Sequence, residues 1–251
     1  MREPWMRWSV LFVCATILVS LVVGFVWLPS VQSDFTAQGL WTSICRAAGV
    51  PDQWGGQQAQ PAAGIRSTAV VLNQAMAGPG SSDAIGRGAT LALQCTICHG
   101  ARGVSETSAP NLAGQYPEVL VKQLADYQHG DRSSAIMQAL AQALSERDVR
   151  DLAAHYAELP RARAASAAAP VLVRVGDPLR NIAPCASCHG GIDHKLGAPW
   201  LEGMPKDYLG AQLRAFGSGQ RRNDSHAQMR NMARQLTARE VDAVSAFYAR
   251  P

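Results

Sequence analysis

The N-terminal segment holds the longest apolar run in the chain. From Trp8 to Leu28 almost every residue is apolar, and none carries a charge. As an α-helix these 21 residues span about 31 Å, which matches the roughly 30 Å hydrocarbon core of a bilayer. Arg2 and Arg7 precede the run, so the positive-inside rule keeps the N-terminus in the cytoplasm. We therefore expect residues 1–33 to form a cytoplasmic tip and a transmembrane anchor.

A cleaved signal peptide is the alternative for this segment, with cleavage after Ser33. The apolar core of a signal peptide is usually about 7–15 residues long, which is shorter than this run. Trp5, Trp8 and Trp27 also lie near its two ends, where tryptophans anchor a spanning helix among lipid headgroups. Both features favour an anchor that remains attached.

Residues 34–80 are expected to form a neck between the anchor and the rest of the chain. The segment 51–61 is rich in Gly, Gln and Pro, which predicts a flexible spacer. A helix is predicted over residues 65–77, ended by a Gly-Pro-Gly sequence. The neck also contains Cys45, to which the sequence assigns no clear role. Apolar residues at helical spacing predict a short helix near the membrane: Phe35, Leu40, Trp41 and Ile44.

Beyond residue 80 the pattern of residues repeats once. The matched segments are APNLAG at 109–114 with APWLEG at 198–203, and CTICHG at 95–100 with CASCHG at 185–190. A tandem repeat at this spacing predicts two copies of one domain. We place the first domain at residues 81–160 and the second at 161–251, with the Ala- and Arg-rich segment 160–170 as the linker.

Both copies carry helical signals and little sign of strands, so we expect an all-α protein. A helix is expected from Ser81 into the first repeated motif. Proline opens the expected helices at 117–128 and 205–216, where its missing N–H costs nothing. Ser145 and Thr237 precede acidic residues and are expected to cap the last helix of each copy.

The repeated motif is Cys-x-x-Cys-His, the attachment signature of c-type haem. Its two cysteines form thioethers with the porphyrin, and its histidine coordinates the iron. A thioredoxin-like pair would need a βαβ context, and a zinc ribbon would place its cysteine pairs about 15–20 residues apart. We therefore expect two covalently bound haem c groups. The motif residues are Cys95, Cys98 and His99 in the first copy and Cys185, Cys188 and His189 in the second.

A downstream methionine is expected to supply the sixth ligand of each iron. Met137 is the only methionine in the first copy, whereas Met204, Met229 and Met232 compete in the second. Met137 and Met229 each lie seven residues before a matched leucine, so the repeat pairs these two. Met232 then falls at a core position. Bis-histidine ligation is the poorer alternative, because the remaining histidines occupy unmatched places: His129, His155, His194 and His226.

Two further groups are candidates for supporting roles at the haems. Pro110 and Pro199 follow the two motifs at nearly equal distances, and a carbonyl there can brace the proximal histidine. A simple turn is the alternative role. Arg132, Arg221 and Arg222 are candidate partners of haem propionates, since guanidinium groups bind carboxylates in a bidentate manner. Plain exposure to solvent is the alternative for these arginines.

Charge and composition add a little to this picture. Residues 81–160 hold 6 basic and 9 acidic residues, whereas residues 161–251 hold 13 and 7. Opposite charges on two domains are consistent with two docking faces, although an unevenly charged solvated surface fits equally well. No basic run and no stripe of alternating basic and aromatic residues occurs, which argues against nucleic acid as a partner.

Residues 81–251 resemble cytochrome c4, a family of dihaem proteins built from two class I cytochrome c domains. The two C-x-x-C-H-G motifs, the Pro-x-Leu-x-Gly segments and the methionine positions carry this resemblance, together with final helices that contain Tyr156 and Tyr248. It implies two tandem class I cytochrome c domains. Together with the predicted anchor, we therefore expect an all-α fold with one N-terminal transmembrane helix followed by these two domains. The anchor with Cys14 and the neck with Cys45 depart from the family pattern.

Electron transfer is expected rather than catalysis, because an iron with His and Met on its two faces has no open position for a substrate. The resemblance implies a periplasmic carrier at the inner membrane that passes electrons along a respiratory chain toward a terminal haem–copper oxidase. A cytochrome subunit of a membrane-bound periplasmic dehydrogenase is the first alternative. A dihaem peroxidase is the second. The expected partners are redox proteins or a membrane complex, with lipid contacted through the N-terminal helix.

Overall fold

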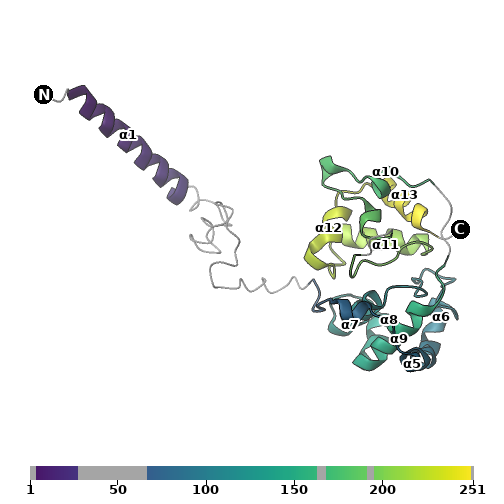
Figure 1. Cartoon of the computed structure of the whole chain (residues 1–251). Coiled ribbons are helices and arrows are strands. Elements are labelled where there is room, and N and C mark those ends of the chain that lie inside the picture. The colour runs from purple at the N-terminus through teal and green to yellow at the C-terminus, as the bar shows by residue number, and fades with distance from the viewer. Residues whose placement is uncertain (1–3, 28–66, 163–167, 191–194, 250–251) are drawn as a thin grey trace. The chain divides into compact units, whose positions relative to one another are not determined.

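The computed structural model describes residues 4–27, 67–162, 168–190 and 195–249 (Figure 1). The chain divides into two compact units, residues 1–63 and 64–251, and each is described by itself. Within the described ranges the secondary structure is helical apart from two isolated bridges, so the all-α prediction is confirmed. The predicted membrane-proximal helix, the spacer at 51–61, Cys45 and His194 lie outside the described residues.

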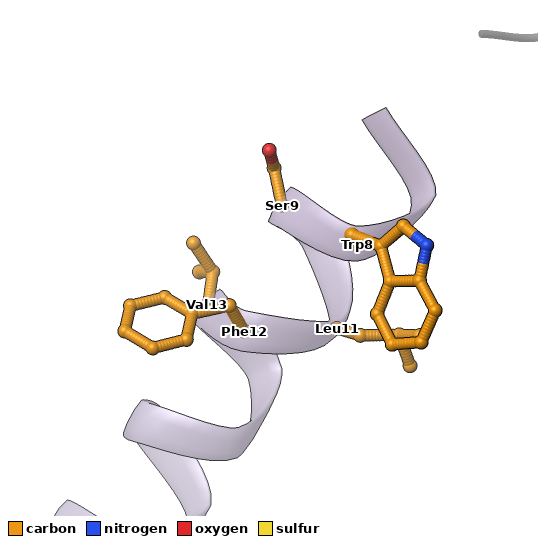
Figure 2. A pocket seen from close by; sticks show the side chains of 5 residues that line it. All are labelled: Trp8, Ser9, Leu11, Phe12 and Val13. Atoms are coloured by element: carbon orange, nitrogen blue, oxygen red, sulfur yellow. The ribbon is translucent and has the colours of Figure 1, made fainter. Parts of the chain in front are cut away.

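The first unit contains helix α1 (Pro4–Val22), which continues as the π-helix η1 (Val23–Trp27). The 18 residues Trp5–Val22 have a mean hydropathy of 1.8, and none of them is buried against protein. Large apolar side chains project outward from this helix, among them Trp8 and Phe12 (Figure 2). The helix is long and apolar enough to cross a membrane, as the sequence predicts.

The second unit consists of two helical lobes, drawn in blue to teal and in green to yellow in Figure 1. After the 3₁₀ turn η3 (Gln74–Ala77), the first lobe contains α5 (Ser82–Ala92), η4 (Leu93–Cys95), α6 (Thr96–His99), α7 (Pro117–His129), α8 (Ala135–Gln142) and α9 (Glu146–Glu158). The second lobe contains α10 (Val171–Arg174), η5 (Pro178–Arg180), η6 (Cys185–Ser187), α11 (Lys206–Gly217), η7 (Ser225–Ala227), α12 (Gln228–Ala233) and α13 (Ala238–Tyr248).

Local sequence explains where the main helices begin. Ser145 and Thr237 each form a complete capping box with an acid three residues later, at the starts of α9 and α13. Both caps agree with the sequence-based expectation. Pro117 opens α7 as expected, but Pro205 is the N-cap of α11 rather than its first residue. Proline suits both places, because neither position needs an N–H donor.

Each lobe has its own apolar core. In the first lobe, α5 crosses α9 closely because Gly88 faces the backbone of Asp151. A Cβ on Gly88 would lie 2.0 Å from the Asp151 carbonyl oxygen, which leaves no room for a side chain. The buried core residues are Ala92, Leu120, Leu152, Ala153 and Tyr156 in the first lobe, and Leu172, Val173, Ile182, Met204, Leu209, Val244 and Tyr248 in the second.

Residues 67–80 form a strap that lies on the two lobes, and here the predicted helix at 65–77 is wrong for most of its described part. Only Gln74–Ala77 is helical, as a 3₁₀ turn packed on α7. The Thr68 hydroxyl donates to the Asp126 carboxylate, and the Ala69 N–H donates to Asp131 Oδ2 (2.8 Å). Such contacts with α7 and the loop after it replace the hydrogen bonds that a helix would make within itself.

The strap also reaches the second lobe. Leu72 packs so closely on Gly197 that a Cβ built on this glycine would lie 2.2 Å from Leu72 Cδ1. At the other end of the strap, Gly80 approaches the side chain of Ala154 on α9. The strap therefore touches both lobes, and the segment that follows the neck is fastened to the folded unit at Thr68 rather than at the start of α5.

We predict that Thr68→Val lowers the stability of the full chain. Asp126 is fully buried and accepts the Thr68 hydroxyl, so the substitution removes one hydrogen bond from a buried carboxylate. Losing such a bond costs about 1–3 kcal/mol. The midpoint of urea unfolding, followed by tryptophan fluorescence, should fall accordingly. Thr90→Val is the matched control, because the exposed Thr90 hydroxyl bonds only its own helix. Equal midpoints for the two variants would contradict this role of the strap.

Candidate haem sites

The first Cys-x-x-Cys-His motif lies on one tight turn between α5 and the following loop. Cys95 ends η4, while Cys98 and His99 lie on the four-residue helix α6. The helix stops at Gly100, whose φ of +78° is a left-handed value that favours glycine. A Cβ there would lie 2.0 Å from the Val104 carbonyl oxygen. The glycine after the motif therefore lets the chain turn back beneath the histidine.

Both motif histidines are buried and hydrogen-bonded in the same way. His99 Nδ1 lies 2.8 Å from the Pro110 carbonyl, and His189 Nδ1 lies 3.0 Å from the Pro199 carbonyl. These are the bonds that the sequence led us to expect from the two prolines. A carbonyl only accepts, so Nδ1 carries the proton and Nε2 keeps its lone pair.

The surroundings of the two histidines keep their rings neutral. Burial lowers the pKa of His99 and of His189, with the proline carbonyls opposing this shift. Burial also raises the pKa of the first thiol of each motif, Cys95 and Cys185. Reactive thiolates have lowered pKa values, so the cysteine environments argue against a redox dithiol.

Three methionines compete for the distal position in the second lobe, and the structure places them differently. Met229 Sδ lies 3.5 Å from His189 Nε2. Met232 instead accepts the Ala183 N–H at its sulfur (3.2 Å) and packs against the core, and Met204 is buried within that core. Met229 is therefore the methionine whose thioether faces the lone pair of the motif histidine.

In the first lobe, the methionine lies on a capped helix. Met137 lies in the first turn of α8, and its N–H donates to the hydroxyl of the N-cap residue Ser134 (3.3 Å). No hydrogen-bond contact joins Met137 to His99, both of which the structure describes. Among the other histidines, His129 and His226 are exposed, and His155 is half-buried beside Tyr156.

The two lobes are joined by a reciprocal exchange of arginine–glutamine bonds. Arg132 donates to Gln123 Oε1 of its own lobe at 2.7 Å and to Gln212 Oε1 of the other lobe at 3.1 Å. Arg221 donates to Gln212 at 2.7 Å and to Gln123 at 3.1 Å. Each guanidinium also stacks on an aromatic ring of its own lobe. The pattern has the form of an approximate two-fold axis between the repeats.

The interface excludes plain solvent exposure for two of the three arginines named from the sequence. Arg132 is buried and Arg221 is half-buried, so neither is a solvated surface charge. Burial, with the nearby charge of Arg132, lowers the pKa of Arg221 to about 10. Arg222 alone is exposed, with its Nε donating to the Gly219 carbonyl (2.6 Å). Gln123 and Arg132 recur in the second copy as Gln212 and Arg221. The sequence does not indicate that these four side chains bind one another.

A buried carboxylate anchors the same interface. Asp126 is fully buried and pairs with Lys122 on its own helix. Asn223 of the second lobe donates to Asp126 through its side chain (2.6 Å) and accepts the Lys122 ammonium at its carbonyl (2.6 Å). Every partner of this ion pair is therefore a polar group held in place by the fold.

The loops that brace the two histidines also bind each other. Asn111, next to Pro110, donates to the Gly203 carbonyl (2.6 Å). Gln115 and Trp200 exchange two bonds, from Trp200 N to Gln115 Oε1 (2.9 Å) and from Gln115 Nε2 to the Trp200 carbonyl (3.0 Å). Trp200 directly follows Pro199. Sequence reasoning missed this network, although the repeated Pro-x-Leu-x-Gly segments mark its place.

The residues at both motifs fit a covalently attached haem. The buried hydroxyls of Tyr156 and Tyr248 have no oxygen or nitrogen partner among the described residues. Each tyrosine packs in the same apolar cluster as the first cysteine of its motif, Cys95 or Cys185. A buried neutral histidine, an apolar wall beside the cysteines and, in the second lobe, a facing thioether are the donor set that a haem c needs.

Comparison with known proteins agrees with this donor set. No family model matches the chain. The chain is 36% identical over 202 residues to the thiosulfate dehydrogenase electron acceptor of Stutzerimonas stutzeri, covering 75% of this chain and 93% of that protein. It is 36% identical over 163 residues to cytochrome c4 of Thiocapsa roseopersicina, covering 61% and 84%. The crystal structure of reduced recombinant cytochrome c4 from Pseudomonas stutzeri superposes with a TM-score of 0.60 at 29% identity, covering 67% and 97%.

The matches cover 93%, 84% and 97% of these three relatives' own length. The repeated motif, histidine brace and apolar core are the features that two class I cytochrome c domains require. The chain therefore belongs to the cytochrome c4 family, as an electron-transfer protein with two covalently bound haem c groups.

Proposed function

We propose that each lobe attaches one haem through its own motif and holds the iron between a histidine and a methionine. The observation that carries this assignment is the 3.5 Å approach of Met229 Sδ to His189 Nε2. Met137 takes the corresponding place in the first lobe by its position in the repeat. The proposed set is Cys95, Cys98, His99 and Met137 for one haem and Cys185, Cys188, His189 and Met229 for the other.

The side chains around each site favour electron transfer over catalysis. A haem c with histidine and methionine ligands supplies reversible one-electron chemistry at a raised potential. The Pro110 and Pro199 carbonyls fix the histidine rings and leave Nε2 free to coordinate. A methionine on the opposite face then leaves no position for a substrate. A dihaem peroxidase would need one labile ligand, and both repeats supply a methionine.

We further propose that the protein works at the inner bacterial membrane, with α1 as a single-pass anchor and the haem lobes in the periplasm. In this position it receives electrons from a periplasmic dehydrogenase and passes them toward a terminal haem–copper oxidase. The donor side is supported by the similarity to a thiosulfate dehydrogenase electron acceptor. That relative is named as the acceptor of electrons from a dehydrogenase. A cytochrome that accepts electrons from one dehydrogenase can also be bound to it permanently, so a second candidate is a fixed cytochrome subunit of a membrane-bound dehydrogenase.

We predict that Met137→Leu and Met229→Leu each remove one part of the iron–thioether charge-transfer band of the oxidised protein. Leucine has a similar volume and no ligand atom, so the apolar packing should persist. Met232→Leu is the control, because its sulfur bonds a backbone N–H and packs in the core. Absorption spectra of the three variants give the measurement. Loss of the second haem's band in Met232→Leu, with Met229→Leu unaffected, would reverse the assignment.

The anchor gives a second prediction. Protein purified from membranes should begin at or near Met1 and should leave the membrane only with detergent. Mass determination of the intact chain tests this directly. A chain that begins at Asp34 and appears in the soluble fraction would establish a cleaved signal peptide instead.

The route of the electrons gives a third prediction. Oxidation of the reduced protein by its terminal oxidase should slow as salt is added, since docking of the basic lobe relies on charges that ions screen over about 8 Å. Charge reversal at the exposed Arg222 and Arg234 should slow it severalfold at low salt, whereas reversal of the exposed Glu146 in the first lobe should not. Stopped-flow absorbance gives the rates.

The outcomes of this experiment separate the candidates. A rate that ignores both salt and the arginine reversals would refute docking through the basic lobe. If no terminal oxidase accepts the electrons, and the protein co-purifies in mild detergent with a dehydrogenase in fixed ratio, the subunit role replaces the carrier role.

A further inference from the structure

The loop that carries Met229 is closed by a buried ion pair. Arg230 Nε donates to Asp224 Oδ1 at 2.7 Å, and the Arg230 N–H donates to Asp224 Oδ2 at 2.9 Å. The two residues are only 7% exposed each. One carboxylate thus binds both the side chain and the backbone of the residue that directly follows Met229. We call the Asp224–Arg230 pair the clasp.

The chain inside the clasp adopts an unfavourable backbone conformation. His226 and Ala227 are consecutive non-glycine residues with left-handed φ values of 54° and 57°. Such a conformation is costly for residues with a Cβ and persists only where the surroundings impose it. The helix that follows, α12, has only 6 residues, so it offers little local support. The clasp is the buried interaction that closes this strained turn.

Within the described residues 67–162, the first lobe has no counterpart of the clasp. Five positions separate Arg132 from Met137, whereas eight separate the matched Arg221 from Met229. The three extra residues of the second copy lie in the clasped loop. In the first lobe, α8 is 8 residues long, and the Ser134 hydroxyl caps it by accepting the N–H of Met137. A capped helix holds one methionine, and a clasped loop holds the other.

The clasp also begins at the interface between the lobes. Asn223, the residue before Asp224, binds the buried Lys122–Asp126 pair of the first lobe through its carbonyl and its side chain. The start of the Met229 loop is thereby fixed to the other haem lobe, and the clasp fixes its end. Neither fixed point is available to Met137.

We propose that Asp224 and Arg230 are positioning residues that hold the Met229 thioether at the iron of the second haem. This inference rests on the proposed role of Met229 as a ligand. Arg230 is joined to Met229 through the main chain, and the pair acts through the geometry of the loop. When the clasp is broken, the strained turn relaxes and Met229 spends less time at the iron.

The full chain with Met137→Leu provides the test, because its remaining charge-transfer band belongs to the second haem. Into this background we would introduce Arg230→Gln and, separately, the milder Arg230→Lys and Asp224→Asn. Arg230→Gln should abolish most of the band, and Arg230→Lys should restore part of it, because lysine keeps the charge but loses the fixed planar donor. The absorbance of the covalent haem and the far-UV circular dichroism show whether each variant is folded.

Imidazole, added to the oxidised Arg230→Gln protein with Met137 intact, gives a second readout, because Met137→Leu would itself open the first iron to imidazole. It binds a haem iron when the methionine leaves, so its apparent affinity measures the fraction of open sites. We expect this affinity to rise about tenfold or more in Arg230→Gln, since removing one partner of a buried ion pair shifts a local equilibrium by more than one factor of ten. In the same variant without Met137→Leu, the first haem's band should stay unchanged.

Glu240→Gln is the matched control. It breaks another ion pair of the second lobe, between Glu240 and Arg180, in which the side chains are 26% and 33% exposed. This variant should lower stability without changing the band or the imidazole affinity. If Arg230→Gln and Asp224→Asn behave like Glu240→Gln, the clasp is purely structural and the inference is overturned. If Met229→Leu itself retains the second haem's band, the ligand assignment fails first.

Discussion

The Asp126 carboxylate is the constraint on which the arrangement of the haem lobes depends. A buried carboxylate must be paired and hydrogen-bonded, because an uncompensated buried charge destabilises a fold by roughly several kcal/mol. Its partners come from three places: Lys122 on the same helix, Asn223 of the second lobe and Thr68 of the strap. Separating the lobes would remove the Asn223 contacts from both members of this ion pair. The ion pair therefore gives the interface a single favoured geometry rather than merely adding attraction.

Near this ion pair, the interface joins the loops that orient the two motif histidines. The carbonyls that orient His99 and His189 belong to loops that bind each other through Asn111 and Trp200. A displacement of one bracing loop is thus transmitted to the other through three hydrogen bonds. Fixed ligand orientation lowers the reorganisation that accompanies electron transfer, as preorganised groups do elsewhere in redox and catalytic sites. The fold of two tandem copies supplies such orientation twice.

Sequence reasoning succeeded where the signal was local. The Cys-x-x-Cys-His motifs specify a covalent chemistry, and capping residues such as Ser145 act on the helix that they precede. The repeat also favours Met229 over Met232, because register fixes which residue occupies a matched place, and this choice of ligand stays a prediction. Sequence reasoning failed where the determining partner lies elsewhere in the chain. A helix is predicted over residues 65–77, yet the strap is non-helical at 67–73 because Thr68 and Ala69 bind acids on and just after α7.

Charge counts along the sequence do not show which charges a partner meets. Residues 161–251 hold 13 basic and 7 acidic residues, but Arg221 is half-buried at the interface, where it donates to Gln212 and Gln123. The formal charge therefore counts one arginine that does not lie on the free surface of the second lobe. The glutamines that accept both interface arginines are neutral, so the guanidinium charges there are solvated by dipoles rather than cancelled.

The two lobes share one fold but hold their methionines through different sets of contacts. A helix capped by Ser134 keeps Met137 in place through regular backbone bonds, which need little from the rest of the protein. Met229 depends on a strained turn, a buried ion pair and an attachment to the first lobe at Asn223. Duplicated domains are free to differ in this way, because each needs only enough local stability to keep its ligand. With the proposed ligand set, we therefore expect ligation of the second haem to respond to the interface more than ligation of the first.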